Sequence, residues 1–186
     1  MLLDKPLVFF DIETTGLRPG YHEITELAFI HEKLGSWCVR VMPKHIDRFE
    51  EEAKRVSGYN ESDWLGAPFF EEVMNKAFSY MDDSVIVGHN LIKFDIPFFN
   101  GQCKLIDSPR RIIDRFIIDT QVLALALLGP RGLNRLNLKA CCSFFDISNA
   151  GEHNAYDDCA RTKLLYEKMM SNIQWAGSGP EQRELW

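Results

Sequence analysis

Apolar and polar residues alternate in three short blocks along the first part of the chain, a pattern typical of half-buried β-strands. The blocks are Leu7–Glu13, Glu23–His31 and Gly35–Met42, and the first is rich in β-branched and aromatic residues. Short connections join the blocks, with a tight turn near Gly35. We therefore expect the three strands to form an antiparallel meander.

The rest of the chain alternates helical patterns with short apolar runs. The runs Ser84–Gly88 and Arg111–Ile118 predict two more strands. Helices are expected over Arg48–Gly58, Phe69–Met81, Asp95–Leu105, Thr120–Leu128, Leu136–Phe145 and Ala155–Met170. This order predicts an α/β fold, with a central mixed five-stranded sheet flanked by helices.

The composition is that of one globular domain. The chain has 186 residues, 46% hydrophobic and 26% charged, which suffices for one packed core. We assign residues 1–175 to this domain and expect 176–186 (AGSGPEQRELW) to form a flexible tail, although Trp186 could also mark a partner-binding peptide. No apolar run reaches the roughly 18 residues that span a bilayer, and MLLDKPL lacks the pattern of a signal peptide. We therefore expect a cytoplasmic protein with no membrane segment.

Charge and cysteine content narrow the chemistry. The net charge of −6 argues against binding nucleic acid through bulk electrostatics. Seven bases against three acids nevertheless lie between Lys104 and Lys139, either as a solvated surface or as a rim that faces phosphates. The five cysteines form no CxxC pair, which favours buried thiols over a zinc site.

Two carboxylates lie one residue apart in FDIETTGL, which runs from Phe10 to Leu17. Side chains alternate along a strand, so Asp11 and Glu13 point to the same face. Two like charges held this close disfavour joint ionisation. Either one carboxylate keeps its proton or cations lie between them.

Two further motifs carry acids at the beginning of predicted helices. In GHNLIKFD (Gly88–Asp95), Asp95 taken alone is most simply an N-cap. In HNAYDD (His153–Asp158), the helical period places Asp158 on the inward stripe and Asp157 beside Arg161 on the solvated side. The stripe that contains Asp158 consists of Ala155, Thr162, Leu165 and Met169.

Four acids together suggest a metal centre, because each lies at the end of a strand or in the first turn of a helix, where side chains converge on a sheet edge. They are Asp11, Glu13, Asp95 and Asp158. Oxygen-only ligands favour hard cations such as Mg²⁺ or Mn²⁺. Two such cations can stabilise the attacking and leaving oxygens of a phosphoryl displacement. A neutral histidine nearby, such as His153, could then deprotonate the attacking water.

FDIETTGL, HNLIKFD and HNAYDD together resemble the three motifs of the DEDDh 3′–5′ exonucleases, from about Leu7 to Met170. This family includes the epsilon proofreading subunit of bacterial DNA polymerase III, RNase T and the TREX enzymes, and the resemblance implies their RNase H-like fold. One residue more separates His89 from Asp95 than in the epsilon subunit, a spacing closer to the TREX enzymes. Asn154 stands where the sister branch of the family would have tyrosine, which indicates the histidine branch.

The resemblance also implies roles for individual residues. It places two divalent cations, Mg²⁺ or Mn²⁺, on four ligands and a general base on His153. The implied metal ligands are Asp11, Glu13, Asp95 and Asp158. The implied substrate-binding residues are Thr14, Thr15, Gly16 and Leu17, which would cradle the 3′-terminal nucleotide, and His89, Asn90 and Phe94, which would line the channel.

The activity that the resemblance implies is release of nucleoside 5′-monophosphates from the 3′ end of single-stranded or frayed nucleic acid, with DNA favoured over RNA. The implied partners are a second copy of the chain, a polymerase or a repair protein. One alternative is a catalytically silent module that binds nucleic acid or a polymerase, but such modules usually lose acids that are all present here. Another is an RNase H-like endonuclease, which would give no reason for the TTGL loop.

Overall fold

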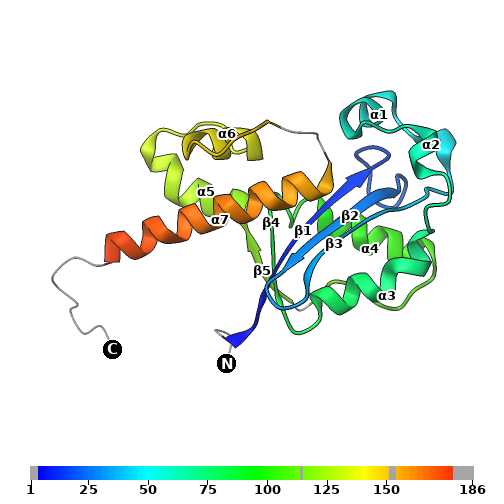
Figure 1. Ribbon diagram of the computed structural model, residues 1–186, viewed down its shortest axis with the longest axis horizontal. Coiled ribbons are helices and arrows are strands. Elements are labelled where there is room, and N and C mark those ends of the chain that lie inside the picture. Colours follow the sequence, from blue (N-terminus) through cyan, green and yellow to red (C-terminus); the bar gives the residue numbers. More distant parts are fainter. Residues whose placement is uncertain (1–3, 114, 151–153, 178–186) are drawn as a thin grey trace.

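The computed structural model describes residues 4–113, 115–150 and 154–177, with side chains up to Ile173. Its centre is one five-stranded sheet in the order β3-β2-β1-β4-β5 (Figure 1). The first three strands, β1 (Leu7–Thr14), β2 (Ile24–His31) and β3 (Gly35–Arg40), pair antiparallel. The last two, β4 (Val85–Gly88) and β5 (Phe116–Asp119), run parallel to β1. The mixed five-stranded sheet predicted from the sequence is confirmed.

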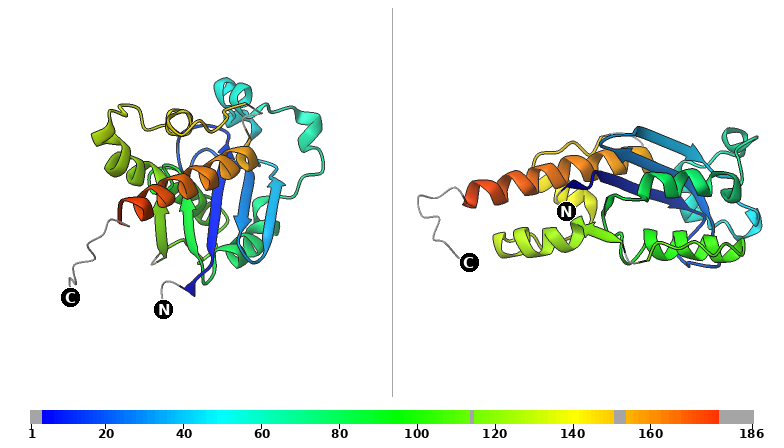
Figure 2. Two further views of the ribbon diagram at one scale, coloured as in Figure 1. Left: turned by 60° about the vertical axis from the view of Figure 1, so that its left-hand side comes forward. Right: turned by 90° about the horizontal axis from the view of Figure 1, so that it is seen from below.

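Helices cover both faces of the sheet (Figures 1 and 2). They are α1 (Glu51–Ser57), α2 (Glu61–Trp64), α3 (Phe70–Met81), α4 (Asp95–Leu105), α5 (Thr120–Leu128), α6 (Leu138–Phe144) and α7 (Ala155–Gly177), with 3₁₀ turns at Ile46–Arg48 and Gly129–Arg131. Helices α3 and α4 lie on one face and α7 crosses the other.

The alternation of side chains along β1 decides which layer each residue joins. Val8, Phe10 and Ile12 belong to the core shared with α3 and α4. Phe9 instead packs with Ala155 and Cys159 of α7. Because Asp11 and Glu13 share the parity of Phe9, their side chains lie on the α7 face. The strand thus delivers two carboxylates to the helix that carries Asp158.

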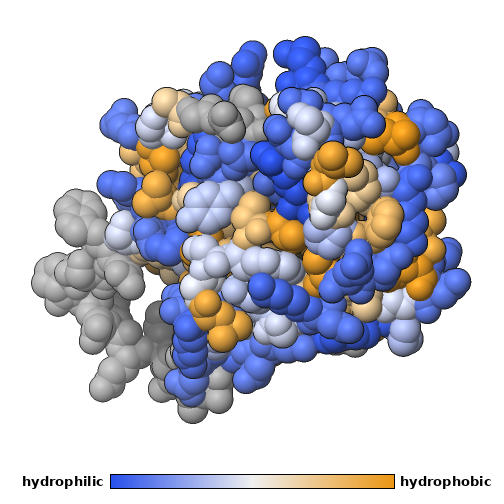
Figure 3. Space-filling model, turned by 45° about the vertical axis from the view of Figure 1, so that its right-hand side comes forward, coloured by the Kyte–Doolittle hydropathy of each residue, from blue (hydrophilic) through white to orange (hydrophobic). Residues whose placement is uncertain are grey.

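Hydrophilic side chains dominate the face in Figure 3, interrupted by separate apolar patches. Within the described part of the chain, no helix is both long and apolar enough to span a membrane.

The strand predicted over Arg111–Ile118 is wrong in its first half, since β5 begins at Phe116. Ile112 is buried, and its N–H donates to Asn100 Oδ1 (2.7 Å), so this segment is tied to α4 and does not pair with β4. The strand predicted to reach Met42 ends at Arg40, because the Met42 N–H donates to the Pro68 carbonyl oxygen.

The helix predicted over Arg48–Gly58 is shorter than expected. It spans Glu51–Ser57, after a 3₁₀ turn, and stops at Gly58, whose φ of 65° is left-handed. The four-residue helix α2 was not predicted. Helix α6 begins two residues later than expected because Asn137 caps it, accepting the Ala140 N–H.

The last helix is longer than the predicted span to Met170 and continues to Gly177. The domain boundary drawn after residue 175 therefore falls inside α7. Residues 178–186, which hold most of the expected tail, lie outside the described residues. The division into a domain and a flexible tail stays a prediction.

Candidate active site

Three acids converge where β1 meets the first turn of α7. Asp11, Glu13 and Asp158 each place one carboxylate oxygen so that the three oxygens lie within 4.8 Å of one another. The first two come from alternate positions of β1 and the third from α7. Of the four acids expected to converge at this edge of the sheet, these three do so by this distance.

The carboxylates of this cluster resist ionisation. Burial raises the pKa of Asp11 well above its ordinary value, and the nearby charges of Asp95 and Asp158 raise it further. Burial, followed by the charge of Asp158, raises the pKa of Glu13 to about 8. Among the residues that the structure describes, no lysine or arginine forms an ion pair with either group. Asp11 and Glu13 are thus half-buried acids that have no ion pair with a lysine or arginine among the described residues.

Asp95 adjoins the cluster without joining it. It is the first residue of α4 and is 2% exposed. Burial raises its pKa to about 8, although hydrogen bonds from its own N–H and that of Ile12 lower it. The hydrogen bond from the Ile12 N–H places the Asp95 carboxyl against β1. Ile12 is the residue between Asp11 and Glu13 in that strand. Asp95 lies outside the group whose oxygens are within 4.8 Å of one another.

Asp158 has a cationic neighbour, which the sequence assigned to the wrong acid. Arg161 is 8% exposed, and its guanidinium pairs with Asp158 Oδ1 one turn away. It approaches Asp157 Oδ2 only to 4.0 Å. The expected Asp157–Arg161 pair is therefore secondary, because Arg161 turns inward. The inward placement of Asp158 holds, since Thr162, Leu165 and Met169 of its stripe are all buried. His153, the expected base, lies outside the described residues.

The TTGL loop that follows β1 is rigidly braced. Thr14 Oγ1 donates to the Gly16 carbonyl oxygen (2.7 Å), and Thr15 Oγ1 accepts the Glu23 N–H (2.9 Å). A side chain at Gly16 would lie 2.5 Å from the ring of His22, so only glycine fits there. Leu17 beyond it is 74% exposed. The loop therefore presents one apolar side chain from a fixed backbone, as a site that packs against a base would need.

The loop between β4 and α4 holds the other expected substrate-binding residues. His89 Nε2 donates to the Leu136 carbonyl oxygen (2.8 Å), and its Nδ1 lies 3.0 Å from Thr120 Oγ1. Burial lowers the pKa of His89, consistent with a neutral ring in this arrangement. Phe94 is half-buried against Phe98, with ring centroids 4.8 Å apart. His89 thus ties this loop to the segment before α6.

Asp119 organises the same loop and was not identified from the sequence. Its carboxylate accepts the N–H groups of Asn90 (3.0 Å), Ile92 (3.1 Å) and Gln121 (2.9 Å). The first of these supports Asn90 in a left-handed conformation with φ of 61°. The signal in the sequence was its place as N-cap of α5. Its contacts with Asn90 and Ile92, in the loop between β4 and α4, depend on the parallel pairing of β4 and β5.

The basic stretch from Lys104 to Lys139 is divided between two places. Arg110 and Arg115 pair with Asp82, which precedes β4 at the end of the sheet away from the cluster. Arg135 is exposed beside Leu136, whose carbonyl oxygen His89 binds. Arg135 therefore lies on a segment that contacts the loop between β4 and α4.

The fold is shared with solved nucleases. Exonuclease I of E. coli in complex with a dT13 oligonucleotide superposes with a TM-score of 0.75 at 15% identity, over 93% of this chain and 42% of that one. The nuclease domain of 3′hExo, a DEDDh family member bound to rAMP, gives 0.73 at 16% identity, over 90% of this chain and 92% of that one. The architecture is therefore that of the RNase H-like exonucleases.

The family model described as exonuclease (RNase T) matches residues 8–166, and the chain belongs to this family. This confirms the resemblance to the DEDDh exonucleases. Among relatives, the chain is 32% identical over 189 residues to DNA polymerase III PolC-type of Halalkalibacterium halodurans. That match covers 92% of this chain but only 12% of the relative, so the chain corresponds to a small part of the polymerase.

Proposed function

We propose that the protein is a metal-dependent 3′–5′ exonuclease that releases nucleoside 5′-monophosphates from single-stranded or frayed 3′ ends. The observation that supports this most strongly is the convergence of Asp11, Glu13 and Asp158 oxygens within 4.8 Å, with raised pKa values for the two acids on β1. Such a cluster is costly to ionise unless cations bind to it.

The donor set fits hard divalent cations. Asp11, Glu13 and Asp158 would hold two ions, Mg²⁺ or Mn²⁺, with Asp95 completing the set from α4. When bound, such ions stabilise the attacking and leaving oxygens of a phosphodiester displacement. Because Glu13 and Asp95 have pKa values of about 8, both must lose protons at pH 7 as the ions bind.

The remaining residues bind substrate and move the proton. His153, five residues before Asp158, would take the proton from the attacking water, a task for which a neutral imidazole is suited. Thr14, Thr15 and Gly16 would cradle the terminal nucleotide, and Leu17 would pack against its base. His89, Asn90 and Phe94 would line the path of the strand.

DNA is the favoured substrate. The H. halodurans relative is a DNA polymerase, and the E. coli Exonuclease I structure holds a dT13 oligonucleotide. RNA is the alternative substrate, because the 3′hExo structure holds rAMP, a ribonucleotide. By the same relationship, a polymerase is the favoured partner, with a second copy of the chain as the alternative, and the cytoplasm is the expected compartment.

Incubation with a 5′-labelled single strand and Mn²⁺ tests this function. A ladder that shortens from the 3′ end is expected, and a matched RNA strand run in parallel measures the sugar preference. Asp11→Asn serves as the inactive control. Absence of cleavage would indicate a silent binding module, and internal fragments would indicate an endonuclease.

A further inference from the structure

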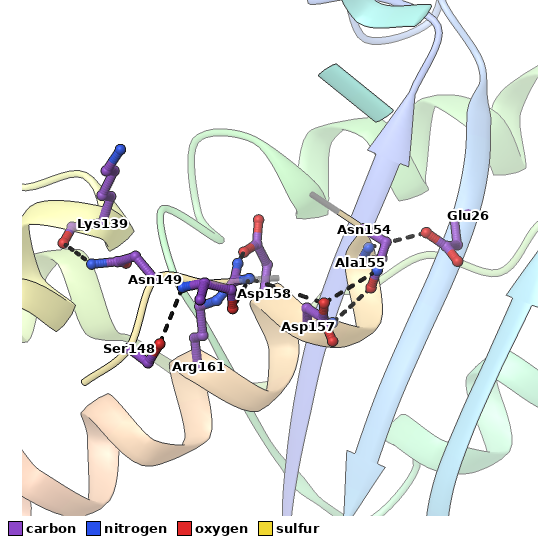
Figure 4. Close-up of polar contacts among 10 residues, drawn as sticks. Glu26, Lys139, Ser148, Asn149, Asn154, Ala155, Asp157, Asp158 and Arg161 are labelled. Carbon is purple, nitrogen blue, oxygen red and sulfur yellow. Dashed lines mark hydrogen bonds and ion pairs between the residues drawn. The ribbon is translucent and has the colours of Figure 1, made fainter. Parts of the chain in front are cut away.

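A fifth carboxylate, Glu26, lies beside the cluster on β2. The register of β1 and β2 places it directly opposite Glu13. Its Oε2 accepts the N–H of Ala155, the first residue of α7, at 3.0 Å (Figure 4). Its Oε1 accepts the thiol of Cys38 at 3.2 Å. Both oxygens therefore have partners within the protein.

The bond to Ala155 fixes the helix in a way that its own cap cannot. Asn154 Oδ1 accepts the Asp157 N–H at 2.8 Å, which is an ordinary local cap. A local cap stabilises the first turn wherever the helix lies. The bond from Glu26 instead joins residues 129 positions apart and sets where the helix begins relative to the sheet.

This position matters because α7 carries Asp158 three residues after Ala155. Ala155 is fully buried, so the beginning of the helix is held between the Glu26 carboxylate and the sheet. Asp11 and Glu13 are held separately by the pairing of β1. A displacement of about 1 Å in a catalytic constellation can cost about 100-fold in rate.

We propose that Glu26 is a positioning residue, which holds the first turn of α7 so that Asp158 meets the carboxylates of β1. The effect of Glu26 on catalysis rests on the proposed exonuclease activity, whereas its effect on the position of α7 can be measured without that activity. Both carboxylate oxygens of Glu26 accept hydrogen bonds within the protein, from the Ala155 N–H and the Cys38 thiol, so we do not count it among the metal ligands.

A second role for Glu26 would be electrostatic, because its charge raises the pKa of Glu13. Two substitutions separate these roles. Glu26→Gln keeps an oxygen that can accept the Ala155 N–H and removes the charge, whereas Glu26→Ala removes both. A positioning role predicts that glutamine substitutes well and alanine does not.

The structure supplies a matched control at the far end of the same strands. Glu32 Oε2 accepts the Leu7 N–H at 2.7 Å, a bond of the same kind that is remote from the cluster. Glu32→Ala should lower thermal stability without changing the response to Mn²⁺. Cys38→Ala controls for loss of the other partner of Glu26.

Two measurements test the proposal. Hydrogen exchange at the Ala155 amide should quicken about 10- to 100-fold in Glu26→Ala, as expected for loss of a bond to a charged acceptor, and stay near the wild-type rate in Glu26→Gln. The Mn²⁺ concentration for half-maximal exonuclease rate should rise about 10- to 100-fold in Glu26→Ala and little in Glu26→Gln.

The outcomes are distinguishable. Equal loss of metal affinity in both variants would assign Glu26 to the charge of the site, and unchanged behaviour in both would leave it no role; either result overturns the proposal. If Glu26→Ala does not fold, the comparison of Glu26→Gln with wild type still decides between charge and position. If the wild-type protein cleaves nothing, the proposed function fails. Hydrogen exchange at the Ala155 amide then still tests whether Glu26 holds the first turn of α7.

Discussion

The two ends of the sheet both carry acidic side chains, but the two ends differ in how fully lysine and arginine side chains pair with those acids. At the end where β4 begins, Asp82 binds Arg110 (2.9 Å) and Arg115 (2.7 Å), and Asp83 pairs with Lys5. These pairs lie at the surface, where such bonds stabilise little.

At the other end, where β1 meets α7, the acids are half-buried and crowd one another. Burial raises the pKa of Glu13 to about 8, and Arg161, which pairs with Asp158, is the one arginine or lysine that pairs with the cluster among the described residues. Acids at the first end, such as Asp82, form surface ion pairs and have no metal to bind in this account. Acids at the second end cost stability until a cation binds, which is what separates a metal centre from an ordinary acidic surface.

The largest effect should follow from removing a carboxylate at the end where β1 meets α7. Replacing Asp11, Glu13 or Asp158 by its amide should lower the exonuclease rate about 1,000-fold or more, because each amide weakens ions that supply several kcal/mol of transition-state stabilisation. The variants should remain folded and gain stability without metal. In a thermal melt, Mn²⁺ should raise the Tm of the wild type much more than that of Asp11→Asn, and equal shifts would refute the ligand assignment.

Removing the expected base should cost less and leave metal binding intact. His153→Ala should lower kcat about 10²- to 10⁴-fold, while the Mn²⁺-induced rise in Tm stays near the wild-type value. The acid limb of the pH–rate profile should change in the variant. Loss of the metal-induced shift together with activity would make His153 a ligand instead, and loss of neither would remove it from the mechanism.

The metal-free protein should lose stability as the pH rises, with an effect of a few kcal/mol. Below about pH 4.5, Glu13 is protonated in both the folded and the unfolded chain and contributes nothing. Between pH 4.5 and about 8 the unfolded chain ionises while the folded one keeps its proton, so the free energy of unfolding falls. The slope corresponds to about 1.4 kcal/mol for each pKa unit.

Urea unfolding between pH 4 and 8 in the presence of EDTA measures this dependence. Glu13→Gln should flatten the slope, and saturating Mn²⁺ should oppose it, because bound ions favour the ionised carboxylates in the folded state. Stability that rises with pH over this window would show that the acids of the cluster ionise freely.

The smallest effect should come from the paired end. Asp82→Asn breaks two ion pairs of a side chain that is 45% exposed, which should cost roughly 1 kcal/mol. The Mn²⁺-induced rise in Tm and the exonuclease rate should be unchanged. A loss of metal response in this variant would erase the distinction between the two ends.

Local signals were enough to predict much of the fold. The spans of α4 (Asp95–Leu105) and α5 (Thr120–Leu128) match their predictions. The strand β5 was predicted too early because Ile112, although apolar, is buried against α4 through a bond to Asn100. That contact is tertiary, and no periodicity in the segment indicates it.

At the candidate site, too, local patterns predicted some features and tertiary contacts determined others. Alternation along β1 and the helical period of α7 sufficed to bring Asp11, Glu13 and Asp158 together. Asp119 and Glu26 were missed because each acts on a segment that is distant in sequence. The partner of a carboxylate across a sheet depends on register, and the sequence pattern alone does not define it.

The most direct test of the central claim is calorimetric titration of Mn²⁺ into metal-free protein at pH 7, repeated in buffers of different ionisation enthalpy. The account predicts binding accompanied by proton release, because Glu13 and Asp95 are largely protonated beforehand. It also predicts that Asp11→Asn binds Mn²⁺ much more weakly. Tight binding in Asp11→Asn equal to that of the wild type, or binding without any release of protons, would contradict the assignment of this cluster as the metal centre.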